Sequence, residues 1–141
     1  MKAPTWNDKL STQIESMDAQ HRQVFEYFAK LWNQLEAGAS QEEVIRSIQE
    51  IVVLEANHCR EEEALMKEHQ FPGYHTHKRE HQQLFMEMRR EFIGPISRGE
   101  MKATAAVLKQ IAKRLVDHIV NEDRKYGLYI NSRQNVATPT K

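Results

Sequence analysis

Seven histidines and a few well-spaced carboxylates are the residues of this chain whose types and spacing could perform chemistry. His58 and Glu62 are four residues apart, as are His77 and His81, so each pair would lie on one face of a helix. Imidazole suits iron, zinc or copper, and carboxylates can bridge two cations while offsetting their charge. Four separate segments contribute the candidate metal ligands: His21, His58, Glu62, His77, His81, His118 and Asp123.

Each of these residues also has an ordinary structural interpretation. A single inward His is usually a hydrogen-bonded core residue, His77 and His81 could lie at the surface, and the acidic run 61–63 could be a solvated face. The combination argues otherwise, because burying five imidazoles and two carboxylates without a cation would leave unsatisfied or charged groups. Structural zinc takes about four ligands and favours thiolates. The larger, thiolate-free set therefore favours two iron ions sharing carboxylates, with manganese as the weaker alternative.

The elements that must position these ligands show helical periodicity. We expect helices over about 18–36, 41–69, 74–92 and 100–120, the last continuing toward residue 129. Gly94-Pro95 is expected to end the third helix. Short connections between helices of similar length favour an all-α, up-down-up-down four-helix bundle. We expect one domain over residues 1–131, with an extended N-terminal arm (1–17) whose Trp6 and Leu10 pack on the bundle, and a disordered tail (132–141).

Composition excludes several other classes of protein. Hydrophobic residues make up 40% of the 141 positions, which suits a folded helical chain. Twenty basic residues balance twenty acidic ones, so no basic field favours nucleic acid. The single Cys59 forms no intramolecular disulfide. The first 17 residues lack the apolar run of a signal peptide, and no stretch approaches the roughly 20 apolar residues of a membrane span. We therefore expect a soluble cytoplasmic protein.

The motifs, taken together, resemble the hemerythrin family over roughly residues 6–130. They are Met17-Asp18-Ala19-Gln20-His21, His58-x3-Glu62, Met66, Phe71-Pro72, His77-x3-His81 and His118-Ile119-x3-Asp123. Tyr126 and Tyr129, which follow the aspartate, resemble the pattern of the family's prokaryotic branch, the bacteriohemerythrins. His69 and His75 match no ligand position and are expected at the surface.

The resemblance implies a role for each ligand. One iron, coordinatively saturated, would be held by His77, His81 and His118, and the other, with an open position, by His21 and His58. Glu62 and Asp123 would bridge the pair together with a solvent-derived oxo or hydroxo group. Dioxygen would then bind reversibly at the open iron.

The pocket over the open iron departs from the family pattern. Leu115 and Ile119 suit its apolar lining, but Cys59 and Arg114 stand where the family usually has Phe and Trp, and Glu55 where an apolar or small residue is common. Glu55 could turn outward while Arg114 reaches solvent. Alternatively, the two pair beside the pocket, or Glu55 reaches the open iron, and either arrangement would make the pocket wetter. Cys59 is either a small buried residue or a redox-sensitive thiol.

Three functions remain in competition. The leading hypothesis is reversible dioxygen binding by an oxygen carrier, store or delivery protein that is not an enzyme and acts as a monomer, with a protein partner for delivery at most. The second is an oxygen or redox sensor, which would need a separate signalling partner. The third is a di-iron enzyme acting on peroxide or nitric oxide. Five His with two carboxylates favours reversible binding, whereas carboxylate-rich di-iron sites favour oxygen activation.

Overall fold

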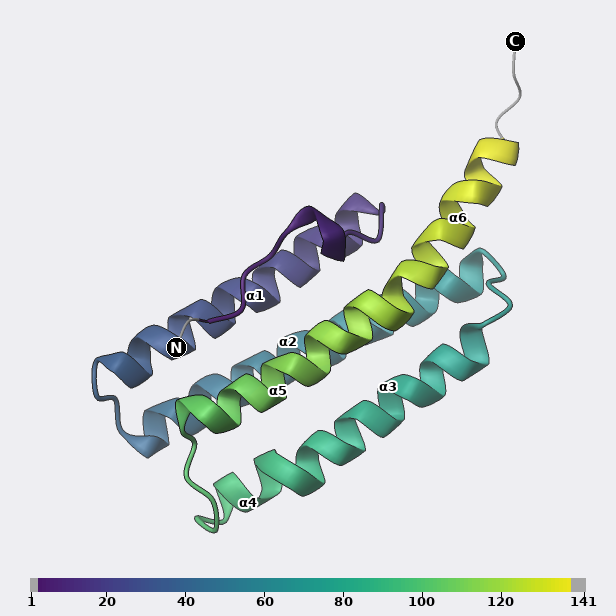
Figure 1. The fold of residues 1–141 in the computed structure, drawn as a ribbon. Coiled ribbons are helices and arrows are strands. Elements are labelled where there is room, and N and C mark those ends of the chain that lie inside the picture. The colour runs from purple at the N-terminus through teal and green to yellow at the C-terminus, as the bar shows by residue number, and fades with distance from the viewer. Residues whose placement is uncertain (1–2, 138–141) are drawn as a thin grey trace.

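Four long helical segments form the bundle, and the computed structural model describes residues 3–137, with side chains over 3–133. Neighbouring segments run antiparallel in up-down-up-down order, which confirms the predicted four-helix bundle (Figure 1). No strand is present over residues 3–137. The bounds of the elements are η1 Asp8–Leu10, α1 Glu15–Glu36, α2 Gln41–Glu68, α3 Tyr74–Met88, η2 Arg89–Ile93, α4 Gly94–Ser97, α5 Ala105–His118, η3 Ile119–Asp123 and α6 Arg124–Ala137.

The short connections follow from local turn chemistry. Gly38, at a φ of +79°, allows the chain to leave α1 in a left-handed conformation. Ser40 then caps α2, its Oγ accepting a hydrogen bond from the Glu43 N–H at 3.2 Å. Thr104 caps α5 in the same way through the N–H of Val107 at 3.3 Å. Short connections of this kind keep successive helices antiparallel and side by side.

The core contains three apolar regions, one of which, Leu10, Phe25 and Ile119, joins the N-terminal arm to the helices. The larger region contains Val24 and Phe28 of α1, Ile51 of α2 and Leu115 of α5. A smaller region, near the opposite end of the helices, is formed by Met17, Met66, Tyr126 and Ile130. On each long helical segment, the predicted metal ligands lie in sequence between these two regions.

The third and fourth helical segments differ from the sequence-based prediction at their ends. The third helical segment does not stop before Gly94-Pro95 but passes through the π-helical turn η2 into α4. Pro95 is tolerated because it lies in the first turn of α4, where an N–H has no partner within the helix. The fourth segment begins at Ala105 rather than Glu100 and extends to Ala137. Residues 132–137 are thus helical where a disordered tail was predicted, and residues 138–141 lie outside the described part of the chain.

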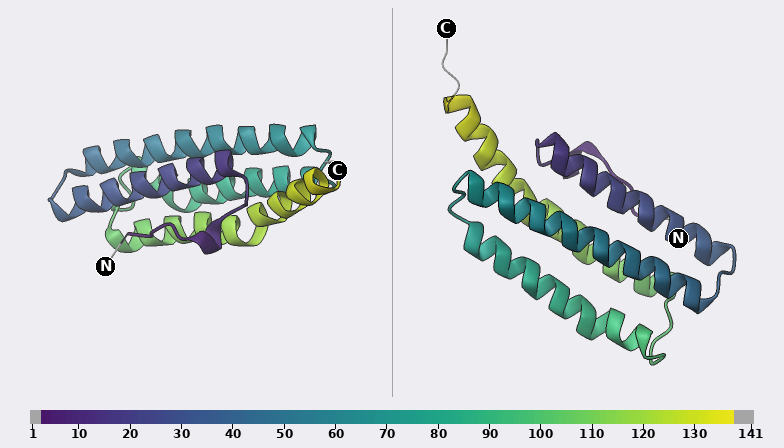
Figure 2. Two further views of the ribbon diagram at one scale, coloured as in Figure 1. Left: turned by 90° about the horizontal axis from the view of Figure 1, so that it is seen from above. Right: turned by 180° about the vertical axis from the view of Figure 1, so that it is seen from behind.

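The N-terminal arm is fixed to the bundle by one buried carboxylate. Asp18 accepts hydrogen bonds from Ser11 Oγ at 2.5 Å and from both the backbone N–H and Oγ1 of Thr12 at 2.8 Å. Leu10 is buried. The Trp6 ring packs edge-on against the Phe25 ring of α1, with 6.0 Å between the ring centroids. The arm therefore crosses the bundle as an extended strap, with η1 against η3 (Figure 2).

Gly127 is the point where α6 passes closest to this arm. A Cβ at residue 127 would lie 1.9 Å from the carbonyl oxygen of Thr12, a backbone atom that cannot move without displacing the arm. We expect Gly127→Ala to lower the free energy of unfolding by about 1–3 kcal/mol, as overpacking does. Urea denaturation measures this loss. Leu128→Ala, at a neighbouring side chain that is 61% exposed, is the matched control and should change stability by less than about 0.5 kcal/mol. Equal losses in both variants would contradict the close packing.

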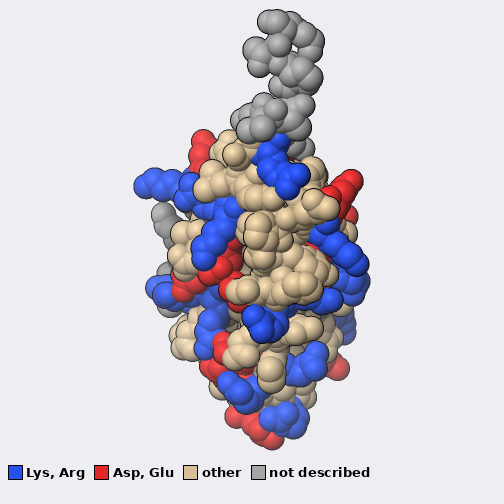
Figure 3. All heavy atoms as spheres, turned by 90° about the vertical axis from the view of Figure 1, so that its right-hand side faces the viewer, with Lys and Arg blue, Asp and Glu red and all other residues tan. Residues whose placement is uncertain are grey.

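The surface carries mixed charge. Lys and Arg side chains are interspersed with Asp and Glu on the face drawn in Figure 3. None of the helices in the described part of the chain has the length and apolar character needed to cross a membrane.

Candidate metal centre

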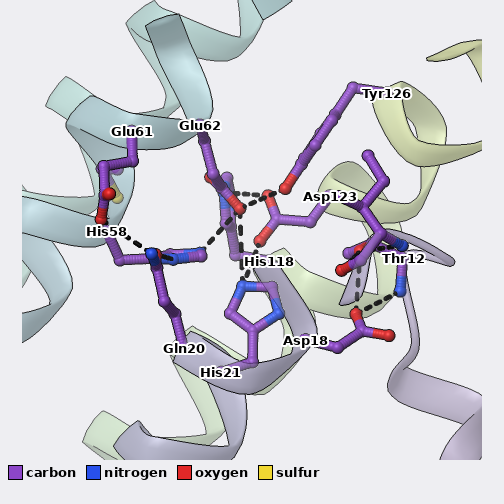
Figure 4. A network of polar contacts seen from close by, with 12 residues as sticks. Thr12, Asp18, Gln20, His21, His58, Glu61, Glu62, His118, Asp123 and Tyr126 are labelled. Atoms are coloured by element: carbon purple, nitrogen blue, oxygen red, sulfur yellow. Dashed lines mark hydrogen bonds and ion pairs between the residues drawn. The ribbon is translucent and has the colours of Figure 1, made fainter. Parts of the chain in front are cut away.

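The structure brings all seven predicted ligands together in the bundle. Figure 4 labels five of them, His21, His58, Glu62, His118 and Asp123. His21 comes from α1, and α2 and α3 each contribute a pair four residues apart. The last residue of α5 and the last residue of η3 complete the set. Six of the seven side chains are buried, and His118 is 11% exposed. Every long helical segment therefore supplies at least one ligand to a single enclosed centre.

The fifth residue after His118 reaches the centre because the helix widens locally. In a regular α-helix, a residue five positions on would point about 140° away around the axis. Residues Ile119–Asp123 instead form a π-helical turn, η3, in which hydrogen bonds span one more residue. Asp123 therefore lies beneath His118, with Oδ1 at 2.9 Å from His118 Nε2.

The two oxygens of Glu62 face different histidines. Oε2 lies 2.8 Å from His58 Nε2 and 3.5 Å from His21 Nε2. Oε1 lies 3.0 Å from His81 Nε2 and 3.7 Å from His77 Nε2. The carboxylate thus stands between two groups of imidazoles, with one oxygen toward each.

Asp123 divides its oxygens in the same way. Oδ2 lies 3.1 Å from His21 Nε2, whereas Oδ1 lies 2.9 Å from the Nε2 atoms of both His77 and His118. The two carboxylates belong to two donor sets, and within each set the donor atoms lie within 4.8 Å of one another. One set has five donors, Glu62, His77, His81, His118 and Asp123, and the other has four, His21, His58, Glu62 and Asp123.

Several donor atoms are buried without a hydrogen bond, although they lie at contact distance from one another. Within residues 3–133, these atoms include the Nε2 of His21, His77, His81 and His118, Glu62 Oε1 and Asp123 Oδ1. In each donor set these atoms lie within 4.8 Å of one another. Buried polar atoms are rarely left in this state, and a cation between them would satisfy imidazole nitrogens and carboxylate oxygens together. The donor set fits metal ions.

The electrostatics of the centre favour bound positive charge. Burial opposes the charging of His21, but the adjacent carboxylates Asp123 and Glu62 outweigh it and raise the pKa of His21 from 6.5 to about 10. The pKa of His77 is raised to about 10 by the same balance. Burial disfavours the ionised form of Glu62, yet the surrounding imidazoles hold its pKa well below the usual value. The two carboxylates therefore stay ionised and attract cations, whether protons or metal.

The imidazoles are oriented by partners to which the sequence analysis assigned no role. His58 Nδ1 lies 2.5 Å from Gln20 Oε1, and Gln20 Nε2 donates to Glu61 at 2.8 Å (Figure 4). His81 Nδ1 lies 2.7 Å from Glu63 Oε2. Such contacts fix the ring so that Nε2 points inward, as in many protein metal sites. Gln20 directly precedes a predicted ligand, and Glu63 directly follows one, which is the signal that could have identified them.

Tyr126 is a further buried partner of the centre. Its hydroxyl donates to Glu62 Oε2 at 2.8 Å, and burial keeps its pKa far above the usual value, so the proton stays in place. We expect Tyr126→Phe to weaken metal binding about 10-fold, because the shared carboxylate loses the donor that holds it. Isothermal titration with a divalent metal measures this change. Tyr129→Phe removes a hydroxyl that donates to the Gln70 carbonyl at 3.3 Å and accepts from Arg133 at 2.7 Å, and it should leave the affinity unchanged because neither partner belongs to a donor set. Equal affinities for all three proteins would contradict the role of Tyr126.

The predicted pocket residues Leu115, Ile119 and Cys59 are all buried. Leu115 also lines two small enclosed cavities, one of which is shared with Ile119. Burial raises the pKa of the Cys59 thiol well above its usual value, so the thiol stays protonated. A protonated, enclosed thiol favours the structural interpretation of Cys59 over the redox-sensitive one.

The structure agrees with only part of the prediction for Glu55 and Arg114. Glu55 does not turn outward, because its side chain is 6% exposed. Arg114 does lie toward solvent, but it bonds Glu87 at 3.2 Å and Glu91 at 2.6 Å on the third helical segment. The predicted Glu55–Arg114 pair therefore does not form, since the guanidinium is held elsewhere. Glu55 is also absent from both donor sets found among the described residues. Exposed His75 and half-buried His69 likewise lie outside both sets.

Comparisons with known proteins agree with the centre. Residues 12–129 match the family model described as "Hemerythrin HHE cation binding domain". The chain is 30% identical over 87 residues to a bacteriohemerythrin of Campylobacter jejuni, a match covering 60% of this chain and 64% of that relative. It is also 30% identical over 122 residues to a bacteriohemerythrin of Pseudomonas paraeruginosa, covering 86% of this chain and 77% of that one.

Among solved structures, a crystal structure of a hemerythrin mutant superposes with a TM-score of 0.79 at 23% identity. The superposition covers 90% of this chain and 96% of the other. This likeness shows a shared fold.

Proposed function

This chain belongs to the hemerythrin family, and we propose that it holds two iron ions and binds dioxygen reversibly, as a carrier, store or local delivery protein. The observation that carries the proposal is the division of each carboxylate's oxygens between two groups of histidines. A carboxylate bound to one ion does not need this arrangement, whereas one that bridges two ions does. The thiolate-free, imidazole-rich donor set favours iron.

The residues of each donor set would hold one ion. His77, His81 and His118 would belong to one ion and His21 and His58 to the other, with Glu62 and Asp123 shared. A solvent-derived oxo or hydroxo group would complete the pair. When bound, the iron pair supplies two one-electron donors and a coordination position for dioxygen. The set with five protein donors is fuller than the set with four, which supports an open position beside His21 and His58.

The chain's own residues would protect this position. Leu115 and Ile119 are 4% and 2% exposed and exclude water from the end of the centre nearest the larger apolar region. The Trp6 ring of the arm packs against α1, with its centroid 6.3 Å from the centroid of the His21 ring. Tyr126 and Gln20 hold a carboxylate and an imidazole in place. A dry, rigid site of this kind favours reversible binding over turnover.

Cycles of oxygen exposure test the proposed function. The full chain is reduced and loaded with iron under argon, exposed to air and returned to argon while its visible spectrum is recorded. We expect about two irons per chain and an absorption band that appears in air and disappears under argon over several cycles. Permanent oxidation on the first exposure would overturn reversible binding, and steady consumption of added peroxide would instead support the enzyme.

A further inference from the structure

Three successive glutamates on α2 extend from three different sides of the helix. Successive residues of an α-helix are about 100° apart around its axis, so a run of three covers more than half of the circumference. Glu62, in the middle, belongs to the metal centre. Glu61 lies toward α1, where it accepts a hydrogen bond from Gln20. Glu63 lies toward α3 and contacts His81. The two flanking carboxylates therefore approach the centre from different sides of α2.

His81 has a carboxylate at its outer nitrogen. Its Nε2 faces the centre, so a ring that binds metal there carries its proton on Nδ1, which donates to Glu63 Oε2 at 2.7 Å. The Glu63 side chain is 19% exposed, and over residues 3–133 it forms no ion pair with a Lys or Arg that would offset its charge. A carboxylate in this position makes an imidazole a more basic and stronger metal ligand.

His58 has a neutral partner in the same place. Its Nε2 also faces the centre, and its Nδ1 donates to the amide oxygen of Gln20 at 2.5 Å. The nearest flanking carboxylate, Glu61, is bonded to the other end of that amide at 2.8 Å and is exposed to solvent (Figure 4). The charge of Glu61 is therefore separated from the imidazole by a neutral group and weakened by water.

The other groups on the side of the four-donor set do not replace such a carboxylate. His21 Nδ1 is buried and has no hydrogen-bond partner among residues 3–133. Glu55 is buried on the same helix as His58, but its hydrogen bond comes from the Cys59 thiol, at 3.9 Å, so it acts on the imidazole only through space. Among the described side chains, Glu63 is thus the carboxylate that is hydrogen-bonded to the outer nitrogen of a ligand, and this ligand belongs to the five-donor set.

We propose that Glu63 is a positioning residue that makes the two metal positions electronically unequal, so that the ion bound by His81 is oxidised before the ion bound by His58. The inference rests on the proposed function, because it needs two irons. In each step one Fe2+ gives one electron to a one-electron oxidant such as ferricyanide and becomes Fe3+, and no bond between protein atoms forms or breaks. A more basic ligand stabilises Fe3+ more than Fe2+, and hydrogen bonds to ligands shift reduction potentials in this way.

Glu63→Gln is the main variant, because it keeps the size of the side chain and an acceptor for the imidazole and removes only the charge. Glu68→Gln, at an exposed glutamate of α2, is the matched control for the loss of one charge. Gln20→Glu combined with Glu61→Gln exchanges the amide and the carboxylate on the side of the four-donor set, and the net charge of the chain stays the same. Thermal denaturation verifies that each variant is folded before it is loaded.

Redox titration under argon, followed by visible spectra, measures the two one-electron steps after the irons have been counted. We expect two separate steps in the wild type and in Glu68→Gln. Glu63→Gln should weaken the preference for Fe3+ at the first step about 10-fold, as the loss of such a partner does, and this raises the first potential by about 59 mV. The exchange at residues 20 and 61 should instead lower the second potential, because it gives the other ion a carboxylate of the same kind.

His58→Ala, which should keep only the five-donor ion, assigns the effect to one position. Its single potential should rise by the same amount when Glu63→Gln is added. An unchanged potential in Glu63→Gln, or an equal shift in Glu68→Gln, would overturn the inference and leave the proposed function standing. The expected shifts in a protein that oxygen oxidises permanently would support the inference while reversible binding fails. Fewer than two irons per chain in the wild type would overturn both.

Discussion

Replacing Glu62 by glutamine is expected to remove both metal ions, whereas replacing His58 by alanine should remove only one. Glu62 belongs to both donor sets, and each of its oxygens faces a different group of histidines. An amide has one neutral oxygen and an NH2 group that cannot bind a cation, so one set loses this donor and the other keeps only an uncharged, weaker one. His58 belongs only to the four-donor set, and its loss leaves the five-donor set intact.

Metal analysis after anaerobic loading and desalting measures this difference as iron per chain. We expect two ions in the wild type, one in His58→Ala and nearly none in Glu62→Gln. His75→Ala, at an exposed His outside both sets, should retain two. If Glu62→Gln kept two tightly bound ions, as the wild type is expected to, the carboxylate would not be shared between them.

Metal binding is expected to release protons and to strengthen as the pH rises from about 6 toward 10. The metal-free pKa values of His21 and His77 are about 10, because the charges of Glu62 and Asp123 outweigh the effect of burial. Both imidazoles therefore carry a proton at neutral pH and must lose it to donate a lone pair to a metal. The carboxylates have lowered pKa values and have no proton to lose in this range.

The sign of the pH effect follows from competition. Raising the pH removes the protons that compete with metal, so the apparent affinity should rise about 10-fold per pH unit for each proton displaced. Titration with Zn2+, which undergoes no oxidation, gives the affinity at each pH. Calorimetry at one pH in buffers of different ionisation enthalpy counts the protons released. An affinity that is independent of pH, with no proton release, would show that the histidines are neutral before metal binds.

The positions of the predicted ligands could be recognised in the sequence because side chains on one face of an α-helix recur with a fixed period. Residues four apart, such as His58 and Glu62, share a face whatever surrounds them. The π-helical turn that ends at Asp123 could not be predicted in this way, because a fixed helical period does not show where one extra residue enters a turn. The continuation past Gly94-Pro95 was missed because a proline is accepted in the first turn of a new helix.

The directions in which long polar side chains extend could also not be predicted from the sequence. Arg114 has a Cα position one turn before His118, yet its guanidinium extends to Glu87 and Glu91. Glu55 forms no ion pair with the side chains of residues 3–133 and stays buried. Which of two residues turns outward is decided by partners on other helices, and these are known only once the bundle is assembled.

The spread of the ligands along the chain, from His21 to Asp123, means that the metal centre is also a cross-link. Each ion would tie together segments that lie far apart in sequence, and so close loops containing most of the polypeptide. Because only the folded chain presents the complete ligand set, every bound ion shifts the folding equilibrium toward the native state. Losing iron would then leave a protein that opens more often and is degraded sooner, so the amount of this protein in a cell would follow the supply of iron.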